Sequence, residues 1–123
     1  MASVLIVDDS PVNCKLLRNI LEAEGYEVVG EASNGKEGYD AFVQKEPDIV
    51  TLDVSMPEMN GIDALKLMKE HNPKAKFIIL SAHKQSDMKE EAAKYGADDF
   101  IAKPYQKAHI LEAMKRCADQ IQI

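Results

Sequence analysis

The sequence lacks the cysteine and histidine clusters that disulfide-stapled domains and zinc sites need. Its 123 residues include two cysteines, Cys14 and Cys117, with no CxxC pair and no mixed cysteine and histidine cluster. Small secreted domains and structural zinc sites depend on such clusters. We therefore expect both cysteines to lie on helices as small apolar residues, too far apart for a disulfide.

Long apolar runs and basic stretches are also missing from the sequence. No run approaches the roughly 18–20 apolar residues that a membrane-spanning helix needs. The N-terminal segment has no basic region and reaches Asp8 and Asp9 at once, unlike a signal peptide. Acidic residues outnumber basic ones 21 to 15, for a net charge of −6, which disfavours direct contact with nucleic-acid phosphates. These absences predict a cytoplasmic protein that binds neither nucleic acid nor membranes directly.

What remains is the composition of one globular domain, expected over residues 1–123. Apolar residues make up 46% of the chain and charged residues 29%, which is ordinary for a protein with one hydrophobic core. A chain of this length buries about two-thirds of its unfolded surface, so it needs no covalent staples.

Short apolar runs alternate with helical stretches along the chain. The expected strands are 4–7, 27–31, 49–52, 77–80 and 99–102. The expected helices are 11–24, 36–45, 61–71, 85–95 and about 105–120. The first helix shows apolar residues at helical spacing, namely Val12, Leu16, Leu17, Ile20 and Leu21. Ser10 is expected to cap the first helix and Asn34 the second.

This alternation predicts an α/β fold, a five-stranded parallel sheet with five helices on both faces. The first, third and fourth strands are solid apolar runs, so we expect them at the centre. The second and fifth are short or interrupted by polar residues, so we expect them at the edges. A strand order of 2-1-3-4-5, the flavodoxin-like arrangement, satisfies both expectations.

Polar side chains follow four of the five expected strands. In open α/β sheets, ligands bind beyond the carboxyl ends of the strands where the strand order reverses, here between the first and third strands. The residues at this edge are Asp8, Asp9, Asp53, Ser81 and Lys103. Any one of them alone is an ordinary polar loop residue, but the whole set at one edge predicts a functional site.

The charges of this set favour a divalent cation. Three carboxylates close together repel one another unless cations join them. Lys103 supplies one positive charge, and a hard divalent ion supplies two more. Oxygen ligands without histidine or cysteine suit Mg²⁺, or less usually Mn²⁺. With only two or three carboxylates, Mg²⁺ keeps some waters and takes a further oxygen from a substrate phosphate.

Taken together, these motifs resemble the receiver domain of two-component response regulators. The resemblance spans about residues 3 to 121 and, within the family, is greatest to single-domain, CheY-like chemotaxis regulators. It rests on five motifs in the family's order, namely Asp8-Asp9, Asp53, Met56-Pro57 with Gly61, Ser81-Ala82 and Lys103-Pro104.

The resemblance implies roles for the acidic residues and the lysine. Asp53 is implied to be the phosphoacceptor, which attacks a phosphohistidine on a sensor histidine kinase. Asp9 is implied to bind Mg²⁺ directly, Asp8 mainly through water, and Ser55 through its backbone carbonyl. Lys103 is implied to pair with a phosphoryl oxygen.

The resemblance also implies a switch that responds to the phosphoryl group. Ser81 stands where the family more often has threonine, and its hydroxyl is implied to bind the attached phosphoryl group. Phe100 matches the aromatic switch position, the alternative being an ordinary core phenylalanine on an edge strand. The bond between Lys103 and Pro104 is a candidate cis peptide, and Tyr105 is expected to be partly exposed at a docking surface.

We therefore expect a phosphorylation-activated signalling switch rather than a turnover enzyme, one that catalyses only its own phosphotransfer and autodephosphorylation. The expected partners are the kinase, a phosphatase and a flagellar motor switch protein. Because no output domain follows the last helix, the alternatives are a phosphorelay shuttle and a receiver excised from a larger transcription factor. An alternative of another class is a Mg²⁺-dependent aspartyl-phosphate hydrolase, which usually has a second aspartate where this chain has Ser55.

Overall fold

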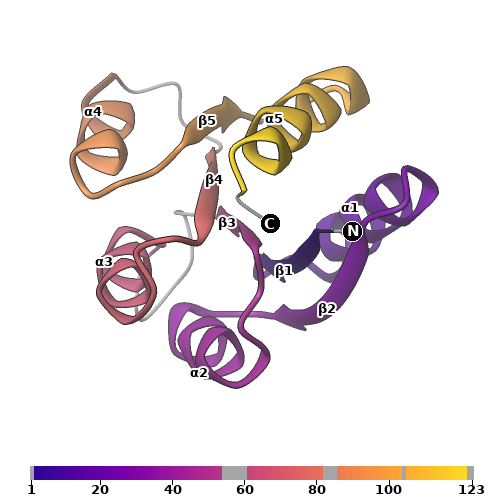
Figure 1. The fold of residues 1–123 in the computed structure, drawn as a ribbon. Coiled ribbons are helices and arrows are strands. Elements are labelled where there is room, and N and C mark those ends of the chain that lie inside the picture. Colours follow the sequence, from indigo (N-terminus) through magenta and orange to yellow (C-terminus); the bar gives the residue numbers. More distant parts are fainter. Residues whose placement is uncertain (1, 54–60, 82–85, 104, 122–123) are drawn as a thin grey trace.

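The computed structural model describes residues 2–53, 61–81, 86–103 and 105–121, and within them five strands alternate with five helices (Figure 1). The strands are β1 (Ser3–Val7), β2 (Glu27–Ala32), β3 (Ile49–Asp53), β4 (Lys76–Ser81) and β5 (Asp99–Ala102). The helices are α1 (Pro11–Ala23), α2 (Gly35–Lys45), α3 (Gly61–His71), α4 (Ser86–Lys94) and α5 (Lys107–Asp119). The expected order is confirmed, and the differences fall at the ends of elements.

The strands form one parallel sheet in the order β2-β1-β3-β4-β5, as the sequence predicts. Buried residues fill β3 and nearly all of β1 and β4, whereas β2 and β5 are partly exposed. This difference follows from position, because only central strands have neighbours on both edges and helices on both faces. The strand order reverses between β1 and β3, so the carboxyl ends of these two strands lie side by side.

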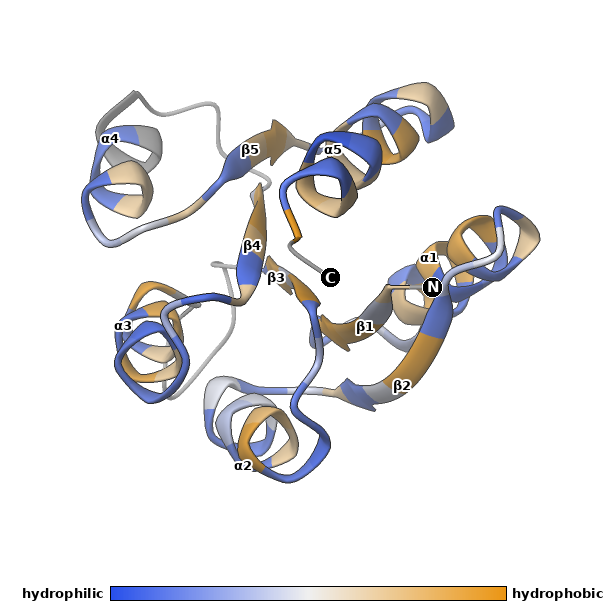
Figure 2. Cartoon of the chain, in the orientation of Figure 1, coloured by the Kyte–Doolittle hydropathy of each residue, from blue (hydrophilic) through white to orange (hydrophobic). Residues whose placement is uncertain are grey.

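Helices cover both faces of the sheet, with α1 and α5 on one face and α2, α3 and α4 on the other (Figure 1). Each face has its own buried cluster, one containing Leu17 and Met114 and the other containing Phe42 and Leu65. Figure 2 shows hydrophobic residues along the central strands and a mixture of both kinds on the helices. Among the described residues, no helix has the length and apolar character needed to cross a membrane.

Helix α1 buries only part of the apolar set that its spacing identifies, namely Leu17, Leu21 and in part Ile20. Its buried residues are Cys14, Leu17 and Leu21, whereas Val12 is 76% and Leu16 47% exposed. At about 100° per residue, positions 14, 17 and 21 share one side of a helix while 12 and 16 lie opposite. The small apolar Cys14 thus belongs to the core, as expected, and Val12 and Leu16 face solvent.

The first two helices are capped as the sequence predicts. The Ser10 hydroxyl accepts a hydrogen bond from the Asn13 N–H at 3.3 Å, and Asn34 accepts one from the Glu37 N–H at 2.8 Å. Such side chains satisfy donors that the first helical turn leaves unpaired. Because Ser10 caps α1, the helix begins at Pro11, two residues after Asp9, and the cap helps to fix the turn that carries Asp8 and Asp9.

Candidate functional site

Asp8 lies directly after β1 and is held almost completely out of solvent. It is 1% exposed. Its main-chain N–H donates to the Ala32 carbonyl at 2.9 Å, and its Oδ1 accepts from the Ser10 N–H at 2.9 Å. Asp9, the next residue, is exposed. The turn after β1 therefore presents one fixed carboxylate inside the site and one at its open edge.

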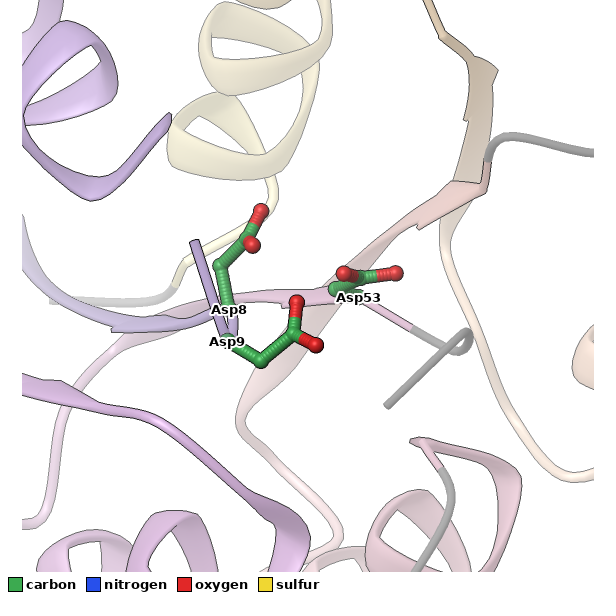
Figure 3. Close-up of side chains that lie close together, drawn as sticks. All are labelled: Asp8, Asp9 and Asp53. Carbon is green, nitrogen blue, oxygen red and sulfur yellow. The ribbon is translucent and has the colours of Figure 1, made fainter. Parts of the chain in front are cut away.

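Asp53 is the last residue of β3 and is 2% exposed. Since β1 and β3 pair with Val7 opposite Leu52, the residues that follow this pair come together at the sheet edge. The three carboxylates of Asp8, Asp9 and Asp53 each offer an oxygen within 4.8 Å of the other two (Figure 3). The sequence predicted this juxtaposition, and the structure confirms it.

Lys103, which follows β5, reaches across to two of these carboxylates. Its Nζ lies 3.2 Å from Asp8 Oδ2 and 3.3 Å from Asp53 Oδ2. Burial alone would lower the pKa of the Lys103 ammonium, but the charges of Asp53 and Asp8, with the hydrogen bonds to both, outweigh burial and raise it. The lysine therefore stays charged at neutral pH and bridges the ends of β1 and β3.

Ser81 ends β4 at the same edge of the sheet. It is fully buried, and its main-chain carbonyl accepts a hydrogen bond of 2.7 Å from the Lys103 N–H. The register of β3 and β4 places Asp53 opposite Leu80, so Ser81 is one residue farther along the neighbouring strand. The structure thus gathers Asp8, Asp9, Asp53, Ser81 and Lys103 at one edge. Ser55 and Pro104 lie outside the described residues.

Phe100 lies away from the carboxylates, near the start of β5. Its ring is partly exposed and packs against the cluster beneath α2, α3 and α4. It borders two hollows, of about 170 Å³ beside Ala92 and Ala97 and about 360 Å³ beside His109 and Arg116. Phe100 therefore lies at the surface beside open space and is not a fully packed core residue.

Two residues near the site have surroundings that sequence patterns could not reveal. The Cys14 thiol donates a hydrogen bond to the Asp8 carbonyl at 3.4 Å, and burial, followed by the charge of Asp8, raises its pKa to about 11. Tyr105 is partly exposed, as expected, yet its hydroxyl is buried and has no partner among the described residues. Burial, with Asp8 and Cys14, raises the pKa of Tyr105 to about 12.

The donor set fits a hard divalent cation. The three clustered side chains offer only carboxylate oxygens, and one of them, Asp9, is exposed enough for an ion to enter. Oxygen ligands of this number and charge suit Mg²⁺, whereas zinc and copper sites use histidine or cysteine. Lys103 offsets only one of the three negative charges, so the cluster as described favours further positive charge.

Comparisons with known proteins agree with this geometry. Residues 4–115 match the response regulator receiver domain family. The chemotaxis protein CheY of Thermotoga maritima is 49% identical over 113 residues, covering 92% of this chain and 94% of that protein. The chemotaxis protein CheY of Listeria monocytogenes is 44% identical over 118 residues, covering 96% and 99%. A solved structure of the CheX–CheY complex with beryllofluoride and magnesium from Borrelia burgdorferi has a TM-score of 0.90 at 34% identity, covering 94% of this chain and 87% of that one. The chain belongs to the response regulator receiver domain family.

Proposed function

We propose that this protein is a signalling switch that is activated when Asp53 accepts a phosphoryl group. The observation that carries the proposal is the setting of Asp53. Its carboxylate is buried at a strand end, shares an acidic cluster with Asp8 and Asp9, and lies 3.3 Å from the Lys103 ammonium. A carboxylate nucleophile that lies beside two further carboxylates suited to a metal ion and is paired with a lysine matches what phosphoryl transfer requires.

The transfer itself is a substitution at phosphorus. A carboxylate oxygen of Asp53 attacks the phosphorus of a phosphohistidine on a sensor histidine kinase. The new P–O bond gives an acyl phosphate, while the P–N bond breaks and its electron pair returns to the imidazole of the kinase. Lys103, freed from Asp53, pairs with a phosphoryl oxygen. Autodephosphorylation is the attack of water on the same phosphorus, which releases the Asp53 carboxylate and inorganic phosphate.

Asp8, Asp9 and Asp53 are the side chains that hold the metal in this proposal. Asp9 would bind the ion directly and Asp8 mainly through water, and the Ser55 carbonyl, which lies outside the described residues, would be the further oxygen ligand. When bound, Mg²⁺ offsets charge on the transferring phosphoryl oxygens and orients them. Mn²⁺ has the same ligand preferences and is proposed as a substitute.

Two further residues connect phosphorylation to a change of surface. The Ser81 hydroxyl, at the neighbouring strand end, donates to a phosphoryl oxygen once the group is attached, and Phe100 then turns toward the space that Ser81 leaves. Complete switching from a 1:99 to a 99:1 population requires about 5.5 kcal/mol of preference for the active state. Charge-assisted hydrogen bonds from Lys103 and Ser81 supply much of that.

The pathway we propose is chemotaxis, in the cytoplasm. Relatives that match this chain over nearly their whole length are named chemotaxis protein CheY, which supports one receiver domain over residues 1–123. The proposed partners are a sensor histidine kinase as phosphoryl donor, a flagellar motor switch protein as target and a phosphatase. The solved complex of CheX with CheY from Borrelia burgdorferi supports the proposal of a separate regulator docking on this fold. We propose no turnover of a separate substrate.

Incubation with acetyl phosphate tests the central step. We expect Mg²⁺-dependent addition of one phosphoryl group, seen by intact-protein mass spectrometry, and its absence after chelation. Peptide mapping that places the group on any residue other than Asp53 contradicts the assignment. The pathway is tested separately by binding of the beryllofluoride-treated protein to a purified motor switch protein. Binding to a histidine phosphotransfer protein instead favours the relay alternative.

A further inference from the structure

The thiol of Cys14 contacts the main chain of the acidic cluster formed by Asp8, Asp9 and Asp53. Cys14 is in the first turns of α1, is 4% exposed, and its Sγ donates to the main-chain carbonyl of Asp8 at 3.4 Å. That carbonyl belongs to the peptide that joins Asp8 to Asp9. Because a peptide unit is planar, a contact that fixes its oxygen also fixes the direction in which the chain continues. The thiol therefore acts on the link between two of the three clustered carboxylates.

Each other polar group of Asp8 also has a described partner. Its N–H donates to Ala32, its Oδ1 accepts from the Ser10 N–H, and its Oδ2 accepts from Lys103. The bond from Cys14 completes this set. A buried carbonyl that loses its donor costs free energy unless it moves toward another partner, and any such movement rotates the peptide that carries Asp9.

We propose that Cys14 is a positioning residue for the metal site, whose thiol fixes the Asp8–Asp9 peptide so that both carboxylates face the cation together with Asp53. The inference rests on the proposed function, since it assumes that the cluster binds Mg²⁺. Cys14 itself touches neither the metal nor the phosphoryl group. Its contribution is to hold the ligands in place before binding, which lowers the reorganisation that binding requires.

Cys117 provides a matched control on the same face of the sheet. It is 2% exposed, lies in the last turn of α5, and makes no hydrogen bond through its thiol among the described residues. The charges nearest to it include Asp98 and Asp99, which lie at the start of β5 and therefore at the opposite end of the sheet. Truncating Cys117 removes the same atoms from a buried site without reaching the acidic cluster.

The test compares Cys14→Ala, Cys14→Ser and Cys117→Ala with the unmodified protein. Mg²⁺ affinity is measured by following backbone amide NMR signals during titration with MgCl₂, and urea unfolding reports stability independently. We expect Cys14→Ala to weaken Mg²⁺ binding by about three- to tenfold, the range set by one lost hydrogen bond behind a ligand. The initial rate of phosphorylation by acetyl phosphate should fall by a similar factor at low Mg²⁺ and recover at saturating Mg²⁺. Cys14→Ser, which keeps a donor, should recover most of the affinity.

Cys117→Ala should lose stability yet keep Mg²⁺ affinity within about twofold of the unmodified protein, because it leaves the Asp8 carbonyl bonded. Equal affinity in Cys14→Ala and the unmodified protein overturns the positioning role. The positioning role is also overturned if Cys14→Ala and Cys117→Ala lose the same amount of Mg²⁺ affinity. The same holds if Cys14→Ser loses as much Mg²⁺ affinity as Cys14→Ala. An unmodified protein that binds no Mg²⁺ instead contradicts the metal site itself, and the positioning role fails with it.

Discussion

Both ends of the sheet carry aspartates beside the strands, but the two ends use them differently. At the amino end, Asp48 accepts the Ser3 N–H at 3.0 Å, and Asp98 accepts the Phe77 N–H at 2.8 Å. Lys76 lies 3.8 Å from Asp98 as well. Asp48 and Asp98 thus each have their own main-chain donor on a neighbouring strand, so these two aspartates hold adjacent segments together.

At the carboxyl end, three aspartates gather around one lysine. One carboxylate oxygen from each of Asp8, Asp9 and Asp53 lies within 4.8 Å of the other two, and Lys103 bridges Asp8 and Asp53. Carboxylates this close repel one another, and the repulsion is stronger where they are partly buried. The difference indicates that aspartates spread out with their own donors hold strands together, whereas aspartates concentrated at one point are suited to binding a cation.

The largest effect is expected at the carboxylate that is proposed to accept the phosphoryl group. Asp53→Asn removes the proposed nucleophile, so we expect phosphorylation by acetyl phosphate to become undetectable by mass spectrometry. Asp48→Asn, at the other end of the sheet, should be phosphorylated normally. Stoichiometric labelling of Asp53→Asn at its original site would refute the assignment.

The second prediction concerns the metal. Because Asp9 is exposed and lies in the cluster, Asp9→Ala should weaken Mg²⁺ binding by at least about tenfold. A ligand that binds only the folded state raises the melting temperature by an amount that grows with the logarithm of its concentration divided by its Kd. We expect MgCl₂ to raise Tm in the unmodified protein and in Asp48→Asn, but not in Asp9→Ala, as measured by calorimetry. An unchanged Mg²⁺ effect in Asp9→Ala argues against a direct ligand.

The third prediction uses pH to compare the two buried thiols. Burial raises the pKa of Cys14 to about 11 and that of Cys117 to about 12, from 9.0. The unfolded chain therefore loses these protons first, and the free energy of unfolding falls as pH rises above 9. Each thiol contributes a slope of up to about 1.4 kcal/mol per pH unit between pH 9 and its folded pKa.

Urea unfolding at a series of pH values measures this slope. Cys14→Ala and Cys117→Ala should each have a shallower slope than the unmodified protein, and the decrease for Cys117→Ala should extend to higher pH. Identical slopes in all three proteins mean that neither thiol is protected from ionisation by burial.

The smallest expected effect is at the amino end of the sheet. Asp48→Asn replaces a charged acceptor of the Ser3 N–H by a neutral one, so we expect a loss of about 1 kcal/mol in the free energy of unfolding. Mg²⁺ affinity should not change. If Asp48→Asn instead weakens Mg²⁺ binding as strongly as Asp9→Ala does, the two ends of the sheet are not functionally separate.

The fold could be predicted because the composition of the strands, their order and the helix-capping residues all indicate the same α/β arrangement. Uninterrupted apolar runs mark β1, β3 and β4 as central, and the polar interruptions in β2 mark an edge. The gathering of Asp8, Asp9, Asp53 and Lys103 follows from that strand order alone, since parallel strands end at one edge. Ser10 and Asn34 are cap residues by chemistry and by position.

Contacts between particular atoms could not be predicted in this way. Apolar spacing identifies a helix but not which of two apolar faces meets the sheet, so Val12 and Leu16 proved to be exposed. Nothing in the sequence indicates that the Cys14 thiol meets the Asp8 carbonyl, or that the Tyr105 hydroxyl lies inside. These features depend on side-chain directions that are set by the packing of α1 and α5 against the sheet.

Lys103 is attached at two points, and this has a mechanical consequence. Its main-chain N–H is bonded to the end of β4, while its side chain ends between Asp8 and Asp53. Negative charge added beside Asp53, as in the proposed phosphorylation, is expected to attract a residue whose backbone links β4 to the edge strand β5. The position of the edge strand β5 is therefore coupled, through the length of the Lys103 side chain, to the charge at the ends of β1 and β3.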